Sequence, residues 1–113
     1  MFQSPPGFVA FDSNGGFRLA DSSIVAPDAA RIPEAVWLTL GADEREGFLP
    51  RAPAVAIELC SKTDDPAILR LKLKRLREAG TAYTVLIDPY RKTIWTAGES
   101  PGSFGLDFSQ VLN

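Results

Sequence analysis

Residues 54–60 read Ala-Val-Ala-Ile-Glu-Leu-Cys, follow directly after Pro53, and decide the fold of this chain. A short run that is almost wholly apolar is typical of a central strand covered on both faces by other parts of the protein. Residues 83–89, Tyr-Thr-Val-Leu-Ile-Asp-Pro, form a second apolar run that a Pro-containing turn closes. We therefore expect two central strands in one sheet.

The segment between these two runs carries the signals of a helix. Thr63-Asp64-Asp65-Pro66 supplies a capping side chain followed by proline at the first helical position. The helix is predicted to run from about Pro66 to Ala79 and to stop at Gly80. A strand, a helix and a strand in this order predict two parallel strands joined by a right-handed crossover.

The rest of the chain is predicted to add shorter elements around this centre. Residues 7–20 have an Asn-Gly turn between two apolar segments, which favours a β-hairpin. Residues 33–47 favour one or two short helices. Further extended segments are predicted at residues 24–32, which bend or begin at Pro27, at 91–97 and at 104–112. These elements predict a single α/β (α+β) domain over residues 1–113, with a mixed β-sheet flanked by helices.

Length and composition limit the chemistry that the chain can perform. The chain has 113 residues, of which 45% are hydrophobic, so it can bury one core in one domain. It has no histidine and a single cysteine, Cys60. This excludes histidine-dependent catalytic triads, disulfide frameworks and zinc sites built from several cysteines. Any metal must have oxygen ligands, which points to magnesium, calcium or manganese.

The charge of the chain is slightly acidic. A net charge of -2 and a pI near 5.0 argue against a broad basic surface for non-specific nucleic-acid binding, but they allow a local basic patch. No stretch approaches ~18 uninterrupted apolar residues, so no transmembrane helix is predicted. The start of the chain lacks the pattern of a signal peptide. We expect no membrane partner and a cytoplasmic location.

Glu58 is the only charged residue in its apolar strand. Alternation along the strand places it on the same face as Ala56 and Cys60, whose small side chains leave space around the carboxylate. A buried carboxylate without a partner is costly or becomes protonated, so Glu58 needs a cation. That cation is a metal ion, an arginine or a lysine. An ordinary ion pair with an arginine is the structural alternative to a functional role.

Lys72 breaks the pattern of the predicted helix. With about 100° per residue, Leu69, Leu73 and Leu76 form the apolar stripe, and Lys72 falls inside it. We expect its ammonium to point toward the sheet or along the edge of the sheet. The alternative is a side chain that extends along apolar neighbours into solvent. Asp28 follows a proline and is a third candidate, although an aspartate in such a turn commonly caps it.

The order of these features resembles the Uma-type restriction-endonuclease-like proteins, a branch of the PD-(D/E)XK nuclease superfamily. The similar stretches extend over nearly the whole chain, and their ordered combination is more specific than any one of them. They are Gly16-Phe17-Arg18-Leu19, Pro27-Asp28-Ala29-Ala30, residues 44–48, residues 52–61, Lys72, Ala79-Gly80, residues 86–89 and residues 104–108.

The resemblance implies a function and a set of metal ligands. Asp28 and Glu58 would bind Mg2+, with Mn2+ as an alternative ion, together with the backbone carbonyl of Leu59. The implied activity is metal-dependent endonucleolytic hydrolysis of DNA phosphodiester bonds. The alternative is a catalytically inactive remnant of the nuclease fold that acts as an interaction module.

The resemblance also implies a catalytic lysine in an unusual place. The third position of the (D/E)XK element is usually lysine, and Cys60 occupies it here. The usual answer in the family is a lysine on the following helix, and Lys72 stands at that position. Lys62 competes for this role if the strand continues that far. The implied catalytic residues are thus Asp28, Glu58 and Lys72.

Members of this family usually have a longer segment before the first strand, including a helix that packs on the sheet. This sequence starts close to its first predicted strand, so we expect a restriction-endonuclease-like core that is shortened at its N-terminus and lacks most of that helical segment. An uncovered apolar sheet face would follow. Such a face favours a homo-oligomer or a partner chain that completes the core.

Overall fold

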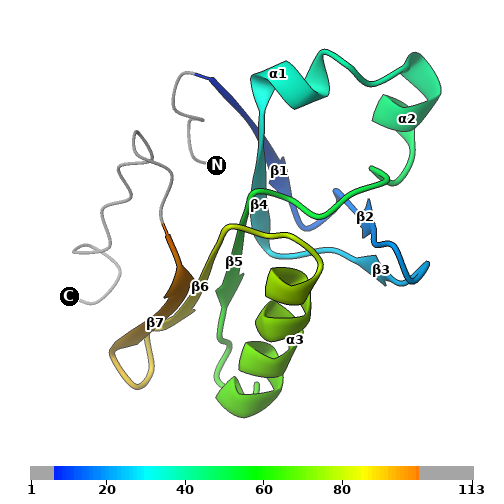
Figure 1. The fold of residues 1–113 in the computed structure, drawn as a ribbon. Helices are drawn as coiled ribbons and strands as arrows, with labels where there is room; N and C mark the ends of the chain where they lie inside the picture. Colours follow the sequence, from blue (N-terminus) through cyan, green and yellow to red (C-terminus); the bar gives the residue numbers. More distant parts are fainter. Residues whose placement is uncertain (1–6, 100–113) are drawn as a thin grey trace.

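A mixed sheet of five strands forms the centre of the computed structural model, which describes residues 7–99 (Figure 1). In their order across the sheet, the strands are β1 (Phe8–Asp12), β4 (Ala29–Pro33), β5 (Val55–Leu59), β6 (Tyr83–Asp88) and β7 (Thr93–Gly98). β5 and β6 run parallel, and the other neighbouring pairs are antiparallel. The extended segment predicted at residues 104–112 lies outside the described residues.

Three helices and a small second sheet complete the described part of the chain. They are α1 (Glu34–Trp37), α2 (Ala42–Glu46), α3 (Pro66–Glu78), and a two-stranded sheet of β2 (Phe17–Arg18) and β3 (Ile24–Val25). The predicted fold class, a mixed sheet flanked by helices, is confirmed. Between residues 7 and 99 no helix is long and apolar enough to cross a membrane. The cytoplasmic location expected from the sequence stays a prediction.

The unit formed by β5, α3 and β6 confirms the central prediction. Asp65 caps α3, because its side chain accepts a hydrogen bond of 2.9 Å from the backbone N–H of Ala67, and Pro66 opens the first turn. The chain leaves the helix through Gly80, whose φ of +119° is a left-handed conformation that favours glycine. Only a short connection therefore separates the carboxyl end of β5 from the start of α3.

The hairpin predicted over residues 7–20 is wrong. Its turn does form, with the N–H of Gly15 donating to the carbonyl of Asp12 at 3.0 Å. However, β1 pairs with β4 in the large sheet, and β2 pairs with β3 in the small one. Burial explains the difference, because Phe17 in β2 is fully buried in a cluster with side chains of β4. Burial of an aromatic ring outweighs the local preference for a hairpin.

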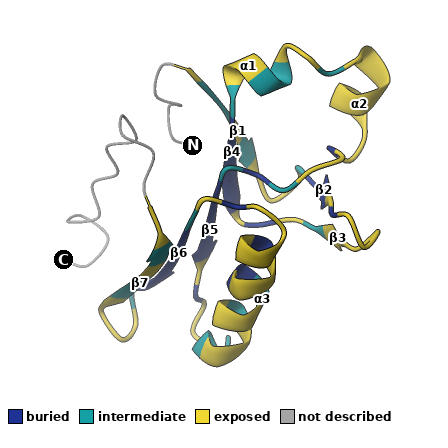
Figure 2. Ribbon diagram, viewed as in Figure 1, coloured by how far each residue is buried: buried dark blue, intermediate teal, exposed yellow. Residues whose placement is uncertain are grey.

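The two faces of the large sheet are covered differently. α1 and α3, which make the main helix contacts with the sheet, pack on the face that carries Ala56 and Leu86. The opposite face carries Val55, Ile57 and Val85, and these side chains are also buried (Figure 2). The uncovered apolar sheet face expected from the resemblance is therefore not observed. The homo-oligomer or partner chain that this face would favour stays a prediction.

Candidate active site

Glu58 lies near the carboxyl end of β5, on the face that α3 covers. Ala56 and Cys60 share this face and are buried in one cluster with Leu73 and Leu76 of α3, as the alternation along the strand predicts. The Glu58 side chain is itself only 3% exposed. A carboxylate at such a depth needs a partner inside the protein, because it has lost most of its contact with water.

Lys72 supplies that partner from α3. Its Nζ lies 2.7 Å from Oε1 of Glu58 and 3.5 Å from the carbonyl oxygen of Ala26. The lysine side chain is 34% exposed, so the ammonium stands between the buried carboxylate and solvent. At this distance the two groups form an ion pair, and the ammonium counters the charge of the buried carboxylate. The prediction that Lys72 turns toward the sheet is confirmed, and the cation beside Glu58 is a lysine.

The structure separates Lys62 from this arrangement. β5 ends at Leu59, and Lys62 lies beyond it in an exposed turn that leads to α3. The alternation that would return Lys62 to the face of Glu58 requires the strand to continue to residue 62, and the strand ends at Leu59. Among the described residues, Lys72 is the ion-pair partner of Glu58.

Asp28 immediately precedes β4 and joins the same corner of the sheet. Its Oδ2 accepts a hydrogen bond of 2.8 Å from the backbone N–H of Leu59, the residue after Glu58 in β5. Asp28 thus caps the end of the neighbouring strand β5. In an extended strand the N–H and C=O of one residue point to the same side, so the Leu59 carbonyl lies on the Asp28 side of β5.

The electrostatics of this corner are unbalanced. Burial raises the pKa of the Glu58 carboxyl above its ordinary value, the Lys72 ammonium opposes this shift, and the negative charge of Asp28 adds to it. The two carboxylates are therefore close enough to interact. Two acids and one ammonium share the corner, and the excess of negative charge would stabilise a further cation there.

Comparison with known proteins identifies the family. The sequence profile described as "Uma2: Putative restriction endonuclease" matches residues 1–102. The chain belongs to the Uma2 family. The resemblance found from the sequence is thereby confirmed. No curated protein matches the sequence closely enough to count as a relative.

The fold of this Uma2 chain is also found in a solved structure. The chain is similar to a putative nuclease belonging to DUF820 from Anabaena variabilis, with a TM-score of 0.68 and 17% sequence identity. The match covers 84% of this chain and 52% of that one, so the chain spans about half the length of that relative. At this identity the likeness shows that the two share a fold.

The donor atoms of the Uma2 site fit a hard divalent cation. Asp28 and Glu58 offer carboxylate oxygens and Leu59 offers a backbone carbonyl, and Mg2+ and Mn2+ prefer such oxygen ligands. Oε1 of Glu58 is buried and lies 2.7 Å from the Lys72 ammonium, so a metal ion bound at this oxygen would share it with that ammonium. In the part of the chain that the structure describes, no three or more acidic, cysteine or histidine side chains gather as a metal cluster. The carbonyl and solvent would therefore have to complete the ligand set.

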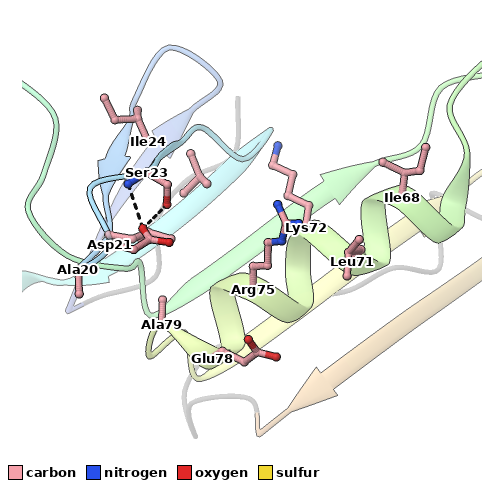
Figure 3. A pocket seen from close by; sticks show the side chains of 12 residues that line it. Ala20, Asp21, Ser23, Ile24, Ile68, Leu71, Lys72, Arg75, Glu78 and Ala79 are labelled. Carbon is pink, nitrogen blue, oxygen red and sulfur yellow. Dashed lines mark hydrogen bonds between the residues drawn. The ribbon is translucent and has the colours of Figure 1, made fainter.

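A groove of about 890 Å3 lies beside the site, between α3 and the β2–β3 hairpin (Figure 3). Lys72 and Arg75 line it from α3, and Asp21 lines it from the hairpin. Much of its wall is apolar and open to solvent, including the exposed side chains of Ile24 and Leu71. The groove borders this corner of the sheet through Lys72 but presents charges of both signs.

The other acidic residues that follow β5 and β6 have structural partners. Asp64 accepts a hydrogen bond of 2.9 Å from the N–H of Ser61, and this bond lowers the pKa of Asp64. Asp88 pairs with the Arg91 guanidinium at 2.8 Å and accepts hydrogen bonds from the N–H groups of Tyr90 and Arg91. These contacts, chiefly the guanidinium, lower the pKa of Asp88. Both residues stabilise turns at strand ends and lie outside the proposed ligand set.

Proposed function

We propose that this Uma2 protein is a metal-dependent endonuclease that hydrolyses phosphodiester bonds of DNA. The observation that carries the proposal is the convergence of the Asp28 and Glu58 carboxylates with the Lys72 ammonium at the carboxyl end of β5. Carboxylates that hold a metal ion, with an ammonium beside them, can hydrolyse a phosphodiester without histidine, and this chain has none. Membership of a family described as restriction endonucleases supports nucleic acid as the substrate.

Asp28, Glu58 and the Leu59 carbonyl hold Mg2+ in this proposal, with Mn2+ as the alternative ion. Restriction-endonuclease-like proteins generally use a divalent metal. When bound, such an ion polarises a phosphoryl oxygen and lowers the pKa of a water molecule. The hydrogen bond from the Leu59 N–H fixes Oδ2 of Asp28, and this orients the carboxylate toward the end of β5.

Lys72 has the charge and the exposure to act on the reacting phosphate. Its ammonium lies between Glu58 and solvent, where it can orient the attacking water or offset the negative charge that grows on the phosphate. The same ammonium compensates the Glu58 carboxylate in the absence of metal. One residue thereby stabilises the buried acid and serves the reaction.

Nicking of supercoiled plasmid DNA tests the proposal. The wild type is expected to nick with Mg2+ or Mn2+ and to stop when EDTA is added. Asp28→Asn and Lys72→Met should each lower the rate by about a hundredfold or more, because each removes a group that acts on the transition state. Lys62→Met is the matched control, because it removes an ammonium from the exposed turn before α3, and its rate should equal that of the wild type.

Equal nicking by the wild type and both site variants would contradict the proposal. It would favour the alternative, a catalytically inactive remnant of the fold that acts as an interaction module. Calorimetric titration with Mg2+ tests the metal site separately, because Asp28→Asn should lose the binding heat even where cleavage is slow. Replacing the plasmid by RNA tests whether DNA is the preferred substrate.

A further inference from the structure

α3 concentrates positive charge in a chain whose net charge is -2. Its thirteen residues include five basic side chains and one acidic side chain, Glu78. At about 100° per residue, Lys72 lies on the flank that borders the active site, whereas Arg70, Lys74 and Arg77 lie on the opposite flank. That opposite flank shares a hollow with Trp95 and Ala97 of β7.

The charges on this second flank are not compensated. Arg70 and Lys74 are exposed, and neither has an ion-pair partner among residues 7–99. Arg77 donates hydrogen bonds to the carbonyl oxygens of Thr81 and Ala82, at 3.0 Å and 2.8 Å, and both of these acceptors are neutral. A polyanion is the partner that such a row of free cations attracts most strongly.

Trp95 of β7 lies beside these cations. Its ring packs in part against the core cluster under α3 and lines two adjoining hollows. One hollow, of about 500 Å3, is shared with Arg70 and Lys74. The other, of about 370 Å3, is shared with Arg70, with Asp65 and with the Asp88–Arg91 ion pair. We call Arg70, Lys74, Arg77 and Trp95 the α3–β7 surface.

We propose that the α3–β7 surface binds an unpaired segment of nucleic acid, with phosphates on Arg70 and Lys74 and a base stacked against Trp95. Basic side chains around an aromatic ring are the combination that holds single strands, because every base has a face on which the ring can stack. A duplex keeps those faces inside its own stack. The inference rests on the proposed function, because a nuclease must hold the strand that it cuts.

The position of the surface agrees with this role. Asp88 and Arg91, at the carboxyl end of β6, border one of its hollows, and Glu58 lies at the carboxyl end of the parallel neighbour β5. Both regions therefore lie at the same edge of the sheet. A helix with its side chains is about 10–12 Å across, so a strand that passes over the start of α3 reaches from one flank to the other within a few nucleotides.

Binding of a fluorescein-labelled oligothymidine of about 15 nucleotides, followed by fluorescence anisotropy in EDTA, tests the phosphate contacts. The double variant Arg70→Gln/Lys74→Gln should weaken binding about tenfold or more. It should also reduce the slope of log Kd against log salt concentration by about 1.4, because each phosphate contact of a single strand contributes about 0.7 to that slope. The matched control is Arg18→Gln/Arg51→Gln, which removes the same charge from exposed positions elsewhere and should bind as the wild type does. Thermal unfolding followed by circular dichroism verifies that each variant is folded.

Tryptophan fluorescence tests the stacking contact. The chain has two tryptophans, so Trp37→Phe leaves Trp95 as the reporter and Trp95→Phe leaves Trp37. The oligonucleotide should quench Trp95 and leave Trp37 unchanged. Trp95→Phe should also weaken binding, and a blunt duplex of the same length should bind less tightly than the single strand.

Three outcomes would overturn the inference: equal weakening by both double variants, no quenching of Trp95, or tighter binding of the duplex. These outcomes are separate from failure of the proposed function. If the wild type binds as described but never cleaves DNA, the nuclease proposal fails and the α3–β7 surface stands. If the wild type cleaves DNA and Arg70→Gln/Lys74→Gln binds and cleaves equally well, the surface alone is wrong.

Discussion

The geometry of the site is tested most directly by removing the Lys72 ammonium while the Glu58 carboxylate stays in place. Lys72→Met keeps an unbranched side chain of similar length and deletes only the charge beside Oε1 of Glu58. The carboxylate is 3% exposed and pairs with this ammonium at 2.7 Å. We expect Lys72→Met to destabilise the protein through Glu58, because the acid is then left buried without its counter-charge.

The size of the effect follows from the burial of the two partners. Breaking a fully buried ion pair by removing one partner costs about 3–5 kcal/mol. Lys72 is 34% exposed, so water screens part of the interaction, and we expect about 2 kcal/mol. Glu58→Gln should cost less than about 1 kcal/mol, because it removes the buried charge and leaves an ammonium that reaches solvent. Adding Lys72→Met to Glu58→Gln should then cost little more.

The effect of Lys72→Met should depend on pH with a definite sign. Burial already raises the pKa of Glu58 in the folded protein, and loss of Lys72 raises it further. An acid with a raised pKa contributes stability below its unfolded pKa, and this contribution is lost as the pH rises through the folded pKa. The destabilisation should therefore be nearly absent near pH 4.5, the ordinary value for this carboxyl, and complete at about pH 8.

Urea unfolding in EDTA, followed by tryptophan fluorescence, measures these differences. With a slope of about 2 kcal/mol/M, the expected loss at about pH 8 corresponds to a midpoint lower by about 1 M. An equal loss at both pH values would show that Lys72 acts by packing and not by its charge. A loss in Glu58→Gln as large as that in Lys72→Met would show that the ion pair is itself net stabilising. Either result would refute the reasoning.

Three further predictions concern the scaffold and its ionisable groups. Gly98→Ala should lower the urea midpoint far more than Gly80→Ala, because both glycines have positive φ but only at Gly98 would a Cβ overlap a backbone atom, the Ala82 carbonyl. Asp88→Asn should destabilise the protein at about pH 7, because an acid whose pKa is lowered by folding contributes stability above its unfolded pKa. The difference from the wild type should vanish as the pH falls through the lowered pKa of Asp88, and urea unfolding curves at about pH 7 and below that pKa measure this. Cys60 should react with a chromogenic thiol reagent only after unfolding, since it is buried and burial raises the pKa of its thiol; rapid reaction of the native protein would contradict this.

The elements with strong local signals are the ones that the sequence predicts correctly. A capping aspartate, a proline and a glycine bound α3, and each acts within a few residues of its own position. β5 and β6 are likewise marked by continuous apolar runs. The pairing of β1 is different, because it depends on the burial of Phe17 against β4, a contact that no local pattern contains. The turn near Gly15 forms as its sequence predicts, but the two strands beside it do not pair with each other.

The residues of the site also differ in how strongly the sequence predicts them. Glu58 and Lys72 are predictable because each is a charge inside an apolar pattern, and one short connection between strand and helix brings them together. Asp28 carries only a weak signal, since its partner is the Leu59 N–H, thirty-one positions away. The Ala26 carbonyl beside the lysine ammonium carries no signal, because every residue presents the same backbone oxygen.

Cys60 stands where the superfamily motif usually has lysine, and packing gives a physical reason for the displacement onto α3. The Cys60 side chain is 1% exposed and packs in one cluster with Leu73 and Leu76, so a lysine there would lie within the core and would have to pass α3 to reach water. Lys72 approaches Glu58 from the flank of the same helix and stays one-third exposed. Both positions deliver an ammonium to the carboxylates, but the helix position desolvates it less. Once α3 packs closely over the end of β5, the helix is the less costly place for the ammonium that pairs with Glu58.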